Sequence, residues 1–149
     1  METNRLESHL GYWLRLVSNR VSTSFAQSLQ SEGLSVGEWV VLVRIQEQPN
    51  VRPADLATAL NLTRGAISKI LEKLESKRWI SRAVQADDSR VQRLSLTSSG
   101  KRILPKLAVI ADRNDETFFG ALTDVERRTL RRLLERLAEL NQIRDVPLE

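Results

Sequence analysis

Apolar residues recur at steps of three and four over much of this chain, which is the spacing of one face of an α-helix. The first such run extends from Leu6 to Leu29 and predicts one long helix. A second run follows Ser35 and ends before Pro49. The pattern Ser35-x-x-Glu38 predicts a capping box there, in which the serine hydroxyl accepts from the third amide and the carboxylate reaches back to the serine amide.

Two shorter helices are predicted in the middle of the chain. Pro53 suits the first position of a helix, because the N–H that proline lacks would have no partner there. Asn61 and Leu62 break this helix, and Thr63 is a suitable cap for the next one. That next helix turns its apolar residues inward and leaves a basic, hydroxyl-bearing face outward.

After Lys77 the apolar period changes from helical to alternating, which predicts a hairpin with a polar turn over residues 86–90. Thr97 begins a further helix, and Pro105 either kinks this helix or delays its start. The pattern Thr123-x-x-Glu126 predicts a capping box before a last helix, whose leucines form a seam for a partner helix.

The order of these elements is four helices, a hairpin and two helices. It predicts a mainly α fold of the α+β type, namely a winged helix-turn-helix with a two-stranded wing, held between N-terminal and C-terminal helices.

The composition excludes several classes of protein. The 149 residues include no cysteine and one histidine, so disulfide frameworks and thiolate metal sites are excluded, and no pattern for acid–base or nucleophilic catalysis is present. We therefore expect no enzyme activity, no cofactor and no metal. No apolar run exceeds five residues and the start of the chain lacks the pattern of a secretory signal, so we expect a cytoplasmic protein with no membrane segment.

Positive charge is concentrated in one stretch of the chain. Residues 63–93 contain eight Lys and Arg against four Asp and Glu, an excess equal to the +4 of the whole chain. The second helix of a helix-turn-helix enters the major groove of DNA, where small residues permit close approach and basic or hydroxyl groups bond to bases and phosphates. The residues in that place here are Thr63, Arg64, Gly65, Ala66, Ser68, Lys69 and Lys73.

Several stretches of the chain together are similar to a known family. The helix-turn-helix stretches are Asp55-Leu56-Ala57, Leu60-Asn61-Leu62-Thr63 and Ile67-Ser68-Lys69-Ile70-Leu71-Glu72-Lys73-Leu74-Glu75. The wing stretches are Asp88-Ser89-Arg90 and Leu94-Ser95-Leu96-Thr97-Ser98-Ser99-Gly100. In combination they resemble the multiple-antibiotic-resistance regulator (MarR) family of bacterial transcription factors.

The resemblance implies a single domain over residues 1–149, with a winged helix-turn-helix DNA-binding lobe at 34–97 and a helical dimerisation lobe at 1–33 and 98–149. It also implies an obligate homodimer that binds double-stranded DNA. The two recognition helices would enter successive major grooves, and the wing arginines would enter flanking minor grooves. Arg90 matches that wing arginine.

Three positions near these motifs need separate comment. Asp88 is expected either to hold Arg90 or simply to form the turn. Arg78 stands where the family usually ends its recognition helix with glycine, and Arg52 stands where a Ser, Thr or Asp cap is expected before Pro53. These two departures leave open how the helices concerned begin and end.

Three aromatic residues are candidates for contact with an effector. Tyr12, Trp13 and Trp39 lie on helices that the family packs around the junction of its two lobes, where small aromatic acids or phenols bind. Aromatic residues at helical spacing pack in a core more often than they line a pocket, so a core stripe is the favoured interpretation.

The leading functional hypothesis is a ligand-responsive repressor that binds a pseudo-palindromic operator as a homodimer, with a small aromatic or phenolic effector. The alternative is a winged-helix module for protein–protein contact, whose basic face meets an acidic partner without sequence-specific DNA binding.

Overall fold

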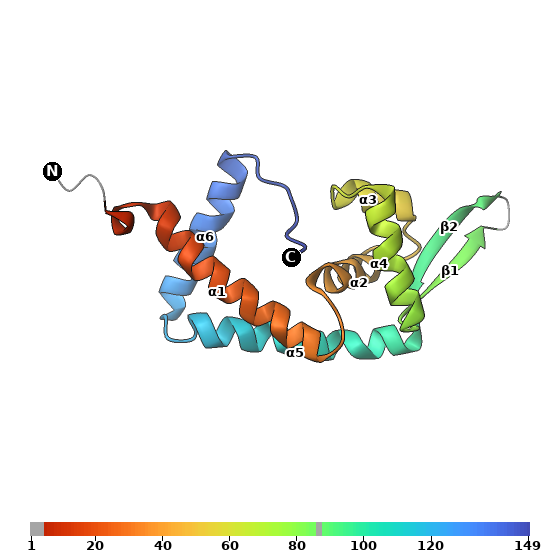
Figure 1. The fold of residues 1–149 in the computed structure, drawn as a ribbon, viewed down its shortest axis with the longest axis horizontal. Helices are drawn as coiled ribbons and strands as arrows, with labels where there is room; N and C mark the ends of the chain where they lie inside the picture. The colour runs from red at the N-terminus through yellow and green to blue at the C-terminus, as the bar shows by residue number, and fades with distance from the viewer. Residues whose placement is uncertain (1–4, 86–87) are drawn as a thin grey trace.

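The computed structural model describes residues 5–85 and 88–149, and for residues 85 and 88–90 it describes the backbone only. Its elements confirm the predicted fold class, since the described residues form helices and one two-stranded antiparallel sheet, which projects from one end of the helices (Figure 1). In chain order they are η1 (Leu6–Ser8), α1 (Leu10–Ser31), α2 (Val36–Glu47), α3 (Pro53–Ala59), α4 (Arg64–Ser76), β1 (Ile80–Gln85), β2 (Asp88–Leu96), α5 (Ser98–Phe119) and α6 (Asp124–Leu140).

The helices fall into two groups (Figure 1). Helix α1 packs against α5, and α6 turns back from the end of α5. Helices α2, α3 and α4 form the second group, beyond the C-terminal end of α1, and α4 packs against both α2 and α3. The wing formed by β1 and β2 extends beyond α4. None of the helices in the described part of the chain combines the length and the apolar character needed to span a bilayer.

The apolar core lies where α2, α3 and α4 meet the base of the wing. Leu29 of α1 and Leu107 of α5 are fully buried in the same core, so the two groups of helices share it. The other large side chains with almost no exposure are Val41, Leu42, Ile45, Leu56, Ile67, Leu71, Leu74 and Leu94.

The predicted helix starts are confirmed at four caps. The side-chain oxygens of Ser35, Thr63, Thr97 and Thr123 each accept a hydrogen bond of 3.1 Å from the amide three residues on. At Thr123 the predicted capping box is complete, because Oε1 of Glu126 also accepts from the Thr123 amide at 3.0 Å. Hydrogen bonding to the Thr123 amide, and secondly to the Thr123 side chain, favours the ionised carboxylate and holds the pKa of Glu126 below its usual value.

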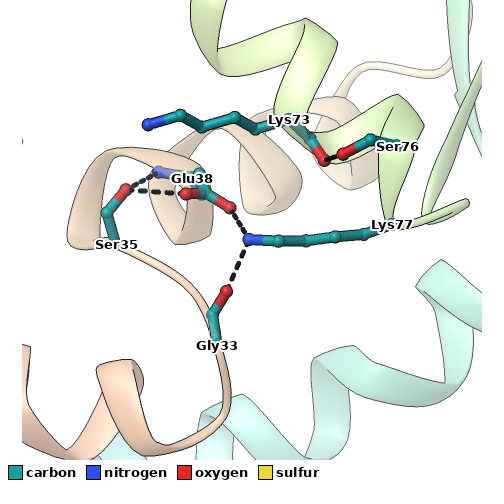
Figure 2. Close-up of polar contacts among 6 residues, drawn as sticks. All are labelled: Gly33, Ser35, Glu38, Lys73, Ser76 and Lys77. Atoms are coloured by element: carbon teal, nitrogen blue, oxygen red, sulfur yellow. Dashed lines mark hydrogen bonds and ion pairs between the residues drawn. The ribbon is translucent and has the colours of Figure 1, made fainter.

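The capping box predicted at Ser35 is wrong in its second half. The carboxylate of Glu38 does not turn back to the Ser35 amide but contacts the Ser35 hydroxyl and the ammonium group of Lys77 (Figure 2). The physical reason is tertiary, since a buried carboxylate is better stabilised by a cation than by a neutral amide.

Two other predicted boundaries need correction. The first helix does not begin at Leu6, because a short 3₁₀ turn precedes it and His9, with extended backbone, separates the two. Of the polar turn predicted over residues 86–90, residues 88–90 belong to β2, and residues 86 and 87 lie outside the described residues.

The question of Pro105 is settled by the start of α5. This helix begins at Ser98, directly after its Thr97 cap, and Pro105 lies inside it. A delayed start is therefore wrong. The cost is local, because the missing proline N–H removes one hydrogen bond to the preceding turn.

The departure at Arg52 is explained by an exposed ion pair. Arg52 is the N-cap of α3 but gives no side-chain cap, and its guanidinium donates to both carboxylate oxygens of Asp55, at 2.8 and 3.1 Å. The bidentate contact holds the pKa of Asp55 below its usual value.

Helices α1, α3, α4 and α6 end in the same geometry, with a left-handed residue just after the helix. Their left-handed residues are Gly33, Asn61, Arg78 and Gln142, with φ of 82°, 54°, 61° and 54°. In α4 the Arg78 amide donates to the Glu75 carbonyl at 2.9 Å and the Trp79 amide to the Leu74 carbonyl at 3.1 Å, which is a Schellman motif. Arginine in place of glycine therefore leaves the geometry of this helix end unchanged.

Replacing Arg78 by glycine should stabilise the protein. Glycine adopts a positive φ without the steric penalty that a Cβ causes, and we expect a gain of about 0.5–1 kcal/mol in the free energy of unfolding. Urea denaturation followed by circular dichroism measures this change.

Ser76→Gly is the matched control, because Ser76 lies in the last turn of the same helix with right-handed backbone. It should destabilise the protein by roughly 0.5 kcal/mol. If Arg78→Gly were as destabilising as Ser76→Gly, the positive φ of Arg78 would carry no strain.

Candidate nucleic-acid interface

The surface of interest is the outward face of α4. Ile67, Leu71 and Leu74 bury the inner face of this helix, with exposures of 2% or less. On the opposite face Thr63, Arg64, Gly65, Ser68, Lys69 and Lys73 are exposed, and Ala66 is half-buried. The structure thus brings together on one surface all the residues predicted on this helix.

Three basic side chains on this face have no counter-ion in the part of the chain that the structure describes. Among the described residues, Arg64, Lys69 and Lys73 take part in no ion pair. A Cβ atom at Gly65 would meet no atom within 4 Å outside the helix's own backbone, so the surface in front of the first turn is open. The free amides of a helix N-terminus add positive potential at the same place, which favours a phosphate group.

Two further cations of the basic stretch, Lys77 and Arg82, have a different role from the one that counting charges predicts. Nε of Arg82 donates to Glu75 at 2.5 Å, and its guanidinium also donates to the side chain of Gln92 at 3.1 Å. Lys77 is paired with Glu38. These two cations attach α4 to its neighbours and are not available to an external anion.

The wing is anchored at its base. Strands β1 and β2 pair in register from Ile80 with Leu96 to Val84 with Gln92. Leu94 is fully buried, and its amide donates to the Val51 carbonyl at 2.9 Å, which ties β2 to the segment before α3.

Two residues predicted to act at the wing cannot be placed as side chains. The backbone of Asp88 and of Arg90 belongs to β2, but both side chains lie outside the described part of the structure. Their roles in DNA binding stay predictions.

The predicted effector residues are separated by the structure. Trp39 lines a groove of about 330 Å³ together with Phe25, Arg44, Val146 and other residues of α1, α2 and the C-terminal segment. Trp39 and Phe25 pack edge to face with ring centroids 5.0 Å apart. Sequence reasoning missed the contribution of the C-terminal segment, for which the local pattern gives no signal.

Tyr12 and Trp13 do not line this groove. Their rings pack edge to face at 5.6 Å near the start of α1, and Nε1 of Trp13 donates to the carbonyl of Glu7 at 2.8 Å. No group of three or more carboxylate or histidine side chains in the described residues is placed to share a metal ion.

The outer helices expose a large amount of apolar surface. Helix α6 has no buried residue. The large apolar residues of α1 and α6 that are at least 44% exposed are Leu10, Trp13, Leu14, Leu16, Val17, Val125, Leu133, Leu134, Leu137 and Leu140. A surface of this kind is typical of a protein interface.

Comparisons with known proteins agree with this architecture. Residues 34–91 match the model of the MarR family. The chain is 32% identical over 133 residues to a Thauera aromatica protein named for regulation of the hcr operon, a match that covers 89% of this chain and 80% of that one. It is 26% identical over 131 residues to the HTH-type transcriptional repressor Rv2887 of Mycobacterium tuberculosis, covering 88% and 94%.

Among solved structures, the chain is similar to a crystal structure of MarR, with 25% sequence identity and a TM-score of 0.77 over 95% of this chain and 94% of that one. The sequence match to the Thauera protein, the family model and this structural likeness lead to the same assignment. The chain is a member of the MarR family of winged-helix transcriptional regulators.

Proposed function

We propose that this protein is a sequence-specific repressor that binds a pseudo-palindromic DNA operator as a homodimer. A small effector changes its affinity for the operator. The observation that carries the proposal is the exposed face of α4, where Arg64, Lys69 and Lys73 have no counter-ion among the described residues. A structural neighbour with a TM-score of 0.72 and 24% identity is a mutant MarR of Escherichia coli in complex with operator DNA.

The outward face of α4 has the chemistry that a major groove requires. Thr63, Gly65 and Ala66 are small enough for the first turn to approach the base edges. Lys69 and Ser68 supply donors to bases, and Lys73 lies one turn further along, where a phosphate contact is expected. Arg90 on the wing is proposed to enter the adjacent minor groove.

The exposed leucines of α1 and α6 support a homodimer. Residues 1–33 and 98–149 would form the dimerisation lobe, and residues 34–97 the DNA-binding lobe. A second copy of the chain would cover the exposed apolar face of both helices. Twofold symmetry then places two recognition helices on half-sites one turn of DNA apart, about 34–36 Å.

The groove beside Trp39 is the proposed effector site. Its volume of about 330 Å³ suits a single aromatic ring. Phe25 and Trp39 offer apolar walls. Arg44 pairs with Glu47 of the same groove at 2.9 Å, so the carboxylate or phenolate of a ligand would replace Glu47 as its partner. Structural neighbours of this chain include CouR of Rhodococcus jostii bound to p-coumaroyl-CoA, and BpsR of Bordetella bronchiseptica, whose DNA binding is regulated by 6-hydroxynicotinic acid.

Selection of bound fragments from a random pool of duplex DNA tests the function itself. We expect an enriched sequence with dyad symmetry. A pool without enrichment, combined with binding that does not weaken as salt is added, would favour the alternative of a protein–protein module.

The variant Lys73→Ala should weaken binding to many duplexes alike. Loss of one phosphate contact should lower the magnitude of the slope of log K against log salt concentration by about one unit. Fluorescence anisotropy of a labelled duplex at several KCl concentrations measures it. Lys106→Ala, which removes an exposed lysine from α5, should bind as the unchanged protein does. An unaltered slope for Lys73→Ala would remove Lys73 from the interface.

Placing lysine at both Leu133 and Leu137 should convert the dimer to a monomer, because two charges would be buried in the apolar interface. Sedimentation velocity measures the change in mass. Val84→Lys is the control, since Val84 is at least as exposed as the two leucines but lies on the wing. A double variant that stays dimeric would place the interface elsewhere.

Trp39→Leu should abolish binding of single-ring aromatic acids, with 6-hydroxynicotinic acid and hydroxybenzoates as the probes. Trp13→Leu should bind them normally, because Trp13 lies outside the groove. Titration calorimetry measures both. The reverse result would move the effector site to the start of α1.

A further inference from the structure

The buried carboxylate of Glu38 is the starting point. Glu38 lies in the first turn of α2 and is only 4% exposed. Its Oε1 accepts from the hydroxyl of Ser35 at 3.3 Å, and its Oε2 contacts the ammonium group of Lys77 (Figure 2). A buried carboxylate without such partners would carry a large desolvation penalty.

Lys77 joins three elements through one group. It is the C-cap residue of α4, and its side chain crosses to the turn between α1 and α2. There Nζ donates to the carbonyl of Gly33 at 2.5 Å as well as to Glu38. The ammonium group also lies 5.3 Å from the ring centre of Trp79, which stabilises the cation further.

The Gly33 carbonyl is itself fixed to α1. Gly33 has a left-handed backbone at the end of this helix, and the next amide, that of Leu34, donates to the Leu29 carbonyl at 3.2 Å. The contacts of Lys77 therefore connect the end of α1, the start of α2 and the end of α4. We call Gly33, Glu38 and Lys77 the clamp.

The clamp defines one arrangement of these helices. Apolar side chains tolerate small rotations of packed helices, whereas an ammonium group held by a carbonyl and a buried carboxylate satisfies both partners in few geometries. Removing Lys77 leaves the buried Glu38 carboxylate without its cation, and removing Glu38 leaves the half-buried ammonium group without its counter-ion. Such a pair adds little net stability, because the cost of desolvating both charges offsets their attraction.

We propose that Lys77 and Glu38 are positioning residues that set the angle of the recognition helix α4 relative to α1. In a homodimer built on α1 and α6, that angle fixes the distance between the two recognition helices and therefore the spacing of DNA half-sites that the protein accepts. This inference rests on the proposed function. It gives Lys77 a role different from that of Lys69 and Lys73, which face outward on α4 and are proposed to contact DNA.

Distance measurement tests the clamp without DNA. Because the chain has no cysteine, spin labels can be attached at Gln27→Cys on α1 and Glu72→Cys on α4, both exposed. Labelled chains are diluted with unlabelled protein so that distances within one chain dominate. In Lys77→Met we expect a broader distance distribution with a shifted mean. Lys73→Met removes the same charge one turn earlier and should leave the distribution unchanged, although it weakens DNA binding.

The double variant Glu38→Gln with Lys77→Met controls for folding. It buries no unpaired charge, so its thermal stability should exceed that of Lys77→Met. Its distance distribution should nevertheless stay broad, because the clamp is absent. A narrow, unshifted distribution in either variant overturns the proposal.

Affinity for operators with altered half-site spacing distinguishes a positioning role from a purely structural one, because loss of stability alone would not change the preferred spacing. Starting from the selected operator, one base pair is inserted or removed between the half-sites. We expect the unchanged protein to lose affinity by about tenfold or more, on the scale of one wrong base pair, and Lys77→Met to discriminate far less. Equal discrimination by both proteins refutes the role in spacing. If the unchanged protein binds no duplex, the proposed function fails, and the label distances still decide on the clamp.

Discussion

The burial of one face of α4 constrains everything else in this molecule. Ile67, Leu71 and Leu74 pack among α2, α3 and the base of the wing. Rotation of the helix about its axis would expose this apolar surface to water, at a free-energy cost of about 25 cal/mol per Å². Arg64 and Lys69 are therefore held on the opposite face. The proposed DNA contact is a consequence of how the core is packed rather than of a mobile loop.

Signals that are local in sequence predicted most of the fold. Thr63, Thr97 and Thr123 each mark a helix start, because the cap and the amide that it accepts are only three residues apart. The apolar period predicted the inner face of α4, because it too depends only on residues three or four apart in the sequence. The start of α1 was missed because His9 forms no side-chain cap and the period continues across the break.

Contacts between distant residues could not be predicted. Ser35-x-x-Glu38 and Thr123-x-x-Glu126 have the same pattern, yet only the second forms a full capping box. The difference is Lys77, which is 39 residues from Glu38 in the chain and adjacent to it in the fold. The groove at Trp39 was equally hidden, since the C-terminal segment that completes it is remote in sequence.

The basic stretch shows why counting charges is a weaker guide than knowing their partners. Lys77 and Arg82 lie near the C-terminal end of α4 and attach it on two sides, to the α1–α2 turn and to the wing. Arg64 and Lys69 lie toward its N-terminal end and have no counter-ion among the described residues. Dissolved salt screens exposed charges more strongly than partly buried pairs. Raising the salt concentration should therefore release a polyanion from the free end of the helix while the attached end keeps its position.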